Sequence, residues 1–151
     1  MQIRHKNREI YFREQAECTQ KYVIPYIEQV LCIKPNLRVL EIGCGEGGNL
    51  KPFLDVGCHC VGIDIDVAQL EKAKAFFANH SLNKNLRLIA NDIYKVSPNE
   101  IGNFDLIILR DVIEHLPNQE LFMHQLKCFM HSESVVFFGF PVWCNPFGGH
   151  Q

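Results

Sequence analysis

The chain has 151 residues, of which 47% are hydrophobic and 21% charged, and a formal net charge of -2. This composition fits one globular domain with a single core and excludes a largely disordered chain. It disfavours a nucleic-acid partner, because phosphate contacts require a basic surface that this balance of charge does not supply.

The seven cysteines are odd in number and lie mostly in apolar segments, which predicts free thiols in a reducing cytoplasm. His59 lies between Cys58 and Cys60, but alternation along a strand turns it away from both, and no second ligand pair has suitable spacing. We therefore expect no metal.

No apolar run approaches the roughly 20 residues that span a membrane, and the first residues contain no signal-peptide h-region. The expected protein is cytoplasmic and has no membrane segment.

Residues 7–31 carry apolar side chains at helical spacing among charges. Pro25 predicts either a break or the first turn of a second helix that begins near Thr19. The simplest arrangement is two helices packed on a sheet. Three aromatic residues of this region either pack in the core or cover a ligand pocket: Tyr11, Phe12 and Tyr22.

Five short apolar runs then alternate with helical patterns. The predicted strands are Arg38–Ile42, His59–Asp64, Leu86–Ala90, Phe104–Leu109 and Ser134–Phe140. The predicted helices cover about 48–56, 67–79 and a segment through Leu121, Phe122, Leu126, Phe129 and Met130. Buried strands alternating with amphipathic helices predict a doubly wound, Rossmann-like α/β fold: a parallel sheet with helices on both faces.

The first predicted strand ends in the glycines Gly43, Gly45, Gly47 and Gly48. Glycine adopts positive φ and lets main-chain N–H groups approach a ligand, so we expect the ligand at this turn. Three of the glycines form G-x-G-x-x-G, a weak pattern by itself that keeps an NAD(P)-dependent dehydrogenase as an alternative. Glu41 argues against it, because a carboxylate repels a pyrophosphate and tolerates a cationic amino group.

Polar residues also follow the next strands, at the sheet edge where ligands bind in open α/β folds. Asp64, about twenty residues after the glycines, is placed to accept hydrogen bonds from two ribose hydroxyls. Asp92 is placed to accept from an exocyclic amine, while Ile65 and Ile93 offer apolar faces to a purine. Each aspartate alone could instead cap the following helix. Together these residues predict a site for a positively charged nucleoside.

Four motifs occur in order: VLEIGCGEG at 39–47, VGID at 61–64, NDI at 91–93 and FDLIILRDVIEHL at 104–116. They resemble the ordered motifs of class I S-adenosylmethionine-dependent methyltransferases, and the resemblance covers roughly residues 22–141. It implies S-adenosylmethionine as the cofactor, S-adenosylhomocysteine as its product, and a small-molecule acceptor.

The same resemblance implies roles for individual residues. It places Glu41, Gly43, Cys44, Gly45 and Gly47 around the methionine part of the cofactor, Asp64 at the ribose, Asp92 and Ile93 at the adenine, and the Arg110 main chain with Asp111 near the methionyl amino group. In domain terms, residues 1–36 are expected to form helices that pack on the domain and cap the pocket, and residues 37–141 the S-adenosylmethionine-binding core.

The acceptor side is less defined. His115 is the candidate general base for an acceptor that must lose a proton; the alternative is a histidine that packs the following helix or orders the loop. The Glu114-His115 pair also resembles a feature of metal-assisted O-methyltransferases, but without a second carboxylate nearby we expect no metal. Candidate acceptor contacts are Tyr11, Trp143 and His150.

The usual family sheet has seven strands, whereas residues 142–151 form a loop after the fifth. This loop resembles the start of an active-site lid. The missing strands predict either an incomplete domain or a homodimer that covers the apolar edge at 135–140. A truncated or inactive S-adenosylmethionine-binding protein is therefore the second functional hypothesis, and a dehydrogenase a more distant third.

Overall fold

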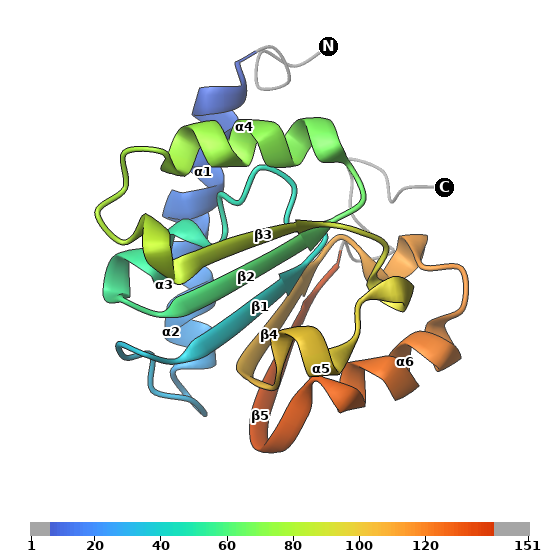
Figure 1. Cartoon of the computed structure of the whole chain (residues 1–151). Helices are drawn as coiled ribbons and strands as arrows, with labels where there is room; N and C mark the ends of the chain where they lie inside the picture. Colours follow the sequence, from blue (N-terminus) through green and yellow to red (C-terminus); the bar gives the residue numbers. More distant parts are fainter. Residues whose placement is uncertain (1–6, 141–151) are drawn as a thin grey trace, which may run out of the picture.

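The computed structural model describes residues 7–140 and contains one sheet of five parallel strands in the order β3-β2-β1-β4-β5 (Figure 1). The strands are β1 (Arg38–Ile42), β2 (His59–Asp64), β3 (Leu86–Ala90), β4 (Phe104–Arg110) and β5 (Met130–Gly139). The order reverses between β1 and β4, which confirms the predicted doubly wound α/β fold and makes the carboxyl ends of these strands the expected ligand position.

Helices cover both faces of this sheet (Figure 1). The α-helices are α1 (Arg8–Cys18), α2 (Ile24–Ile27), α3 (Lys51–Val56), α4 (Val67–Phe77), α5 (Pro98–Ile101) and α6 (Gln119–Cys128). Single turns occur at Thr19–Val23, Asn83–Asn85, Ile93–Lys95 and Ile113–His115. One apolar core lies between the sheet and α1 to α4, and a second between the sheet and α5 and α6.

The N-terminal segment resolves the alternatives that Pro25 left open. A π-helical turn, Thr19–Val23, joins α1 to α2, and the Ile24 N–H donates to the Thr19 carbonyl five residues back. Proline lacks an N–H and its ring crowds the preceding turn of a regular helix. The wider turn accommodates Pro25 in the first turn of α2, so the helical run continues without a break.

Several predicted boundaries are wrong. Helix α3 begins at Lys51 and not near Gly48, because 48–50 form a turn in which the Leu50 N–H donates to the Gly47 carbonyl at 3.0 Å. Helix α6 ends at Cys128, before the predicted end at Met130.

Strand β5 differs from the prediction at both ends. Met130 pairs with Phe104, and pairing resumes at Val135 after a bulge that Ser134 stabilises by donating from Oγ to the Phe104 carbonyl at 2.6 Å. This strand therefore begins four residues earlier than predicted, and ends at Gly139, before Phe140. A bulge interrupts the two-residue alternation from which strands are predicted.

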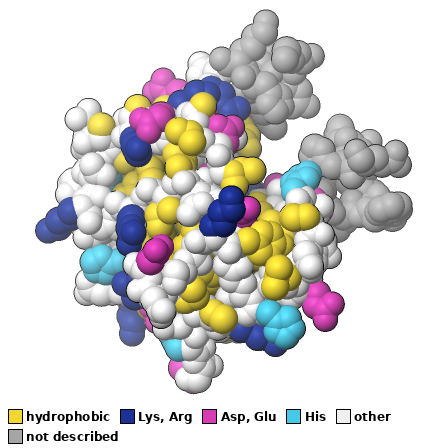
Figure 2. All heavy atoms as spheres, turned by 45° about the vertical axis from the view of Figure 1, so that its right-hand side comes forward, with side chains coloured by type: hydrophobic (Ala, Val, Ile, Leu, Met, Phe, Trp, Pro, Cys, Tyr) yellow, Lys and Arg dark blue, Asp and Glu magenta, His cyan; other side chains and the backbone are white. Residues whose placement is uncertain are grey.

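The surface mixes side-chain types. Hydrophobic side chains are exposed among acidic and basic ones on the side that carries α6 (Figure 2). Leu121 of that helix is 53% exposed. None of the helices in the described part of the chain is long and apolar enough to cross a bilayer.

Gly62 of β2 provides a test of how tightly the central strands are packed. A Cβ at this position would lie 2.7 Å from the Cys44 sulfur and 3.0 Å from side-chain carbons of Leu50 and Leu88. We expect Gly62→Ala to lower the free energy of unfolding by about 1–3 kcal/mol through overpacking, measured by urea denaturation. The control is His59→Ala, at an exposed position of the same strand, with an expected change within about 0.5 kcal/mol. Equal stability of both variants would contradict the packing argument.

Candidate functional site

A cavity of about 720 Å³ lies at the carboxyl ends of β1 to β4. The residues after these four strands form its floor, and a face of α1 forms one wall. The segment after β4, including His115, lines the rim. This volume is within the roughly 300–1,000 Å³ usual for pockets that bind small molecules and cofactors.

The glycine turn after β1 is held against β2. The N–H groups of Gly43 and Cys44 both donate to the Ile63 carbonyl, at 2.8 and 3.1 Å. Gly43, Gly45 and Gly47 have φ values of +71°, +51° and +80°, which L side chains rarely adopt. Sequence and geometry therefore agree that this turn requires glycine, and the chain can approach a ligand there without Cβ atoms.

Asp64 lies at the end of β2 beside this turn. Its Oδ2 accepts from the Gly45 N–H at 2.7 Å, and its Oδ1 accepts from the Asp66 N–H at 2.8 Å. Asp66, and not Asp64, caps α4 by accepting from the N–H groups of Ala68 and Gln69. An ionised carboxylate has about four acceptor positions, so two remain available on Asp64 for donors in the cavity.

Asp92 caps the short helix that follows it, the alternative role that the sequence left open. Its Oδ1 accepts from the Tyr94 N–H at 3.0 Å and caps the short helical turn Ile93–Lys95. The residue also lines the cavity, together with Ile65, which is 75% exposed, and Ile93, which is 5% exposed. Capping orients the carboxylate and leaves its other oxygen for a ligand.

Asp111 follows the last residue of β4 in a strained conformation. Its φ is +54°, a left-handed value that aspartate tolerates better than most residues, and its N–H donates to the Gly139 carbonyl at 2.7 Å. Such outliers gather at functional sites, where the surrounding structure enforces them.

A buried polar cluster lies beneath the cavity. The Asn49 amide donates to Glu41 Oε1 at 2.8 Å, and its Oδ1 accepts from Thr19 Oγ1 at 2.9 Å and from Arg110 Nη1 at 2.8 Å. Glu41 is 1% exposed, and no described residue pairs with its Oε2. Burial raises the pKa of Glu41 to about 8, an effect that the Asn49 hydrogen bond and the Arg110 charge only partly offset. The carboxyl is therefore mostly protonated at neutral pH.

The cavity brings together most of the residues predicted from sequence: Tyr11, Gly43, Cys44, Gly45, Asp64, Ile65, Asp92, Ile93, Arg110, Asp111 and His115. Glu41 and Gly47 lie outside its lining. Glu41 belongs to the buried cluster, and a Cβ on Gly47 would meet the Phe77 ring at 2.9 Å. Trp143 and His150 lie outside the described residues.

The structure divides the aromatic residues whose role the sequence left open. Tyr11 lines the cavity, Phe12 is buried and stacks on Phe76 at 4.5 Å, and Tyr22 is 60% exposed.

Burial raises the pKa of the Cys44 thiol well above its usual value, so this cavity residue is no nucleophile. Among residues 7–140, no group of three or more His, Cys, Asp and Glu side chains is arranged to hold a metal ion.

Sequence reasoning missed several lining residues: Arg8, Glu14, Gln15, Cys18, Asn49 and Gln69. A weak signal existed for those on α1, because Arg8, Tyr11, Gln15 and Cys18 recur at spacings of three and four residues and therefore share one helical face. A polar helical face is usually taken as solvated, and only the packing of α1 shows that it borders a cavity.

The comparisons with known proteins identify the family. A family model described as a methyltransferase domain matches residues 12–141, most of the chain. The protein belongs to this family, which confirms the resemblance found in its motifs.

Three relatives illustrate its range. The chain is 26% identical over 125 residues to the ubiquinone biosynthesis O-methyltransferase of Bartonella tribocorum, covering 76% of this chain and 49% of that protein. It is 28% identical over 96 residues to a sterol 24-C-methyltransferase of Gibberella zeae, covering 63% of this chain and 25% of that protein. Its fold matches a crystal structure of coclaurine N-methyltransferase bound to N-methylheliamine and S-adenosylhomocysteine, with a TM-score of 0.66, 20% identity and coverage of 79% and 35%. The chain spans at most about half the length of these two curated relatives.

The protonation of Glu41 has a measurable consequence. Its pKa is raised from 4.5 to about 8 in the folded chain, so between these values the folded state holds more protons than the unfolded one. The stabilisation that comes from the Glu41 proton is fully present below pH 4.5. As the pH rises from there to about 8, the free energy of unfolding falls by up to about 1.4 kcal/mol per pH unit.

Glu41→Gln removes this proton linkage. We expect the stability of the variant relative to the unchanged chain to improve steadily as pH rises from about 5 to 8, measured by urea denaturation at each pH. A difference that stays constant over this range would contradict a neutral Glu41.

Proposed function

We propose that this chain forms the cofactor-binding part of an S-adenosylmethionine-dependent methyltransferase that acts on a small-molecule acceptor. The observation that carries the proposal is the charge of the cavity. Among residues 7–140, five carboxylates line it (Glu14, Glu46, Asp64, Asp92 and Asp111) against two guanidinium groups (Arg8 and Arg110). This excess of negative charge favours a cationic ligand and disfavours the pyrophosphate of a dinucleotide.

The residues present fit this cofactor. Asp64 keeps free acceptor positions for ribose hydroxyls, Ile65 and Ile93 offer apolar contacts for the adenine, and the glycine turn permits close approach of the backbone. When bound, S-adenosylmethionine supplies a methyl group on a cationic sulfonium, whose leaving group needs no protonation. The main tasks of the protein are then to orient the donor and the acceptor and to exclude water.

His115 is the proposed general base for acceptors that must lose a proton. It lies in the turn Ile113–His115 after β4 and lines the cavity rim, where an acceptor would approach the cofactor. We propose acceptor contact for Tyr11 as well, since it borders the same cavity from α1.

The cavity residues indicate the cofactor more directly than they indicate the chemical class of the methyl acceptor. The names of the three relatives specify oxygen, carbon and nitrogen methylation. One fold therefore serves different acceptor atoms, and the residues shared around the cofactor do not select among them. We propose a small-molecule acceptor in keeping with the ubiquinone, sterol and coclaurine in those names.

Two further expectations belong to this proposal. The free thiols of Cys44, Cys58 and Cys60 are buried, as suits the predicted cytoplasmic location. Within the described residues β5 pairs only with β4, so one edge of this strand is open, and its covering by a second copy stays a prediction that sedimentation velocity tests.

Calorimetric titration with S-adenosylhomocysteine tests the proposed function. We expect saturable binding, no binding of NAD, and a loss of about 1–3 kcal/mol of binding free energy in Asp64→Ala, because two ribose hydroxyls lose their acceptor. The control is Asp66→Ala, which removes the cap of α4 and a hydrogen bond from the Gln69 amide but keeps the Asp66 N–H that orients Asp64; its affinity should fall much less than that of Asp64→Ala. Failure to bind would reject the cofactor assignment, and binding without methyl transfer to a metabolite panel would favour the inactive alternative.

A further inference from the structure

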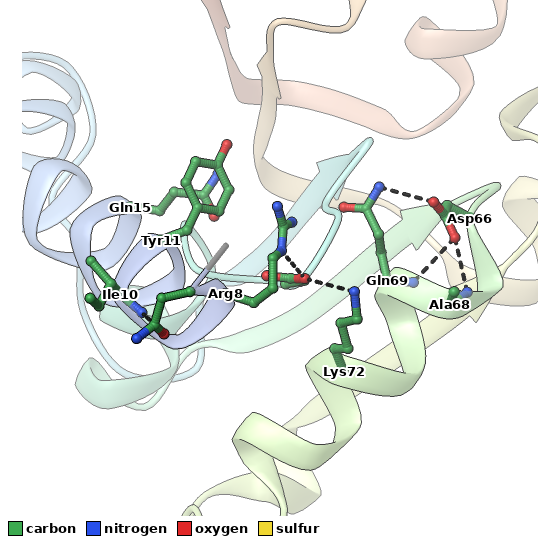
Figure 3. Close-up of polar contacts among 10 residues, drawn as sticks. Arg8, Ile10, Tyr11, Gln15, Asp66, Ala68, Gln69 and Lys72 are labelled. Carbon is green, nitrogen blue, oxygen red and sulfur yellow. Dashed lines mark hydrogen bonds and ion pairs between the residues drawn. The ribbon is translucent and has the colours of Figure 1, made fainter. Parts of the chain in front are cut away.

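Helix α1 brings a cationic side chain to the glycine turn. Figure 3 shows Arg8 reaching from α1 toward α4, and its Nε donates to Glu46 Oε1 at 2.7 Å. From the other side Lys72 of α4 approaches the same oxygen at 3.7 Å. Side chains from α1 and α4 therefore approach the Glu46 carboxylate of the glycine turn from opposite sides.

This carboxylate is unusually placed. The Glu46 side chain is 0% exposed and lines the cavity, and within residues 7–140 its Oε2 has no hydrogen-bond partner. A buried carboxylate costs several kcal/mol unless it is paired. Here two cations share one carboxylate, so the three groups keep a formal charge of +1 beside a cavity that is otherwise acidic.

The guanidinium of Arg8 is also oriented. It lies over the Tyr11 ring, 5.0 Å from its centre, and the Tyr11 hydroxyl accepts from the Gln15 amide at 3.1 Å. Glu46 accepts from Nε alone, and neither Nη1 nor Nη2 forms a hydrogen bond or ion pair with a described residue. The paired donors of the guanidinium fork remain for a ligand.

The second guanidinium on the cavity is committed elsewhere. Arg110 Nη1 donates to Asn49 Oδ1 at 2.8 Å and to Thr19 Oγ1 at 3.3 Å, within the buried cluster that contains Glu41. Of the two arginines among the described lining residues, Arg8 is therefore better placed to receive an anionic group.

We propose that Arg8 binds the carboxylate of the cofactor's amino-acid end and that Glu46 is the positioning residue that orients Arg8. This inference rests on the proposed function. The nucleoside contacts lie at the ends of β2 and β3, so the amino-acid end of the ligand extends toward β1 and α1. A planar guanidinium pairs with a carboxylate through two parallel hydrogen bonds, which lysine cannot reproduce.

Two ligands separate this role from a general effect on the site. S-adenosylhomocysteine carries the amino-acid end, and 5′-methylthioadenosine has the same nucleoside thioether without it. We expect Arg8→Gln to weaken S-adenosylhomocysteine binding about 10- to 100-fold in calorimetry and to leave 5′-methylthioadenosine affinity unchanged, because only one ligand offers a carboxylate. Arg8→Lys should lose an intermediate amount for the first ligand.

The matched control is Arg13→Gln on the same helix. The Arg13 side chain is 68% exposed, pairs only loosely with Glu17 at 3.9 Å and does not line this cavity, so affinity for both ligands should be unchanged. Equal S-adenosylhomocysteine affinity in Arg8→Gln and the unchanged chain would overturn the inference while the proposed function stands. Equal losses for both ligands would also overturn it, and would assign Arg8 a structural role.

Glu46→Gln tests the positioning role. It should weaken S-adenosylhomocysteine binding about 3- to 10-fold and cause no further loss when combined with Arg8→Gln, because both act through one interaction. Additive losses, or a loss of 5′-methylthioadenosine affinity, would show that Glu46 supports the turn and not Arg8. Binding of neither ligand by the unchanged chain would reject the proposed function itself.

Discussion

The site depends on one constraint, the attachment of the glycine turn to the end of β2. Gly43 and Cys44 share the Ile63 carbonyl, and Gly45 donates to the Asp64 carboxylate. Gly43 and Gly45 hold positive φ values in this turn, which glycine adopts more readily than other residues. The same bonds orient Asp64, which makes the turn and the proposed ribose contact one structural unit.

Charge is organised around this unit in two layers. A buried layer joins Glu41, Asn49, Thr19 and Arg110 beneath the cavity and links the N-terminal segment to β1 and β4. A second layer at the cavity wall pairs Glu46 with cations from α1 and α4. Because both layers include residues from the N-terminal helical segment, its packing and the electrostatics of the site are coupled.

Much of this arrangement could be predicted. Strands β2 and β3 have the predicted bounds, because branched apolar runs between turn residues give a strong signal. The predicted positions failed where tertiary pairing overrides local pattern, as at Met130, which joins β5 across a bulge. At the site, the residues at strand ends were predictable, because parallel strands bring their carboxyl ends to one edge of the sheet. Arg8 and Gln69 lie on helices and were not predictable, because the sequence pattern does not specify which residues of a helix will border the sheet edge.

By itself the sequence determined the fold class, the glycine turn and the acidic residues at successive strand ends, because these depend on local periodicity and on backbone conformations that few residue types adopt. Only the tertiary structure decided that Glu41 is enclosed behind the cavity and that α1 supplies its wall. Burial and charge pairing arise between segments far apart in the chain. Arg8 and Glu46, 38 residues apart, are neighbours only because α1 packs against the turn that follows β1.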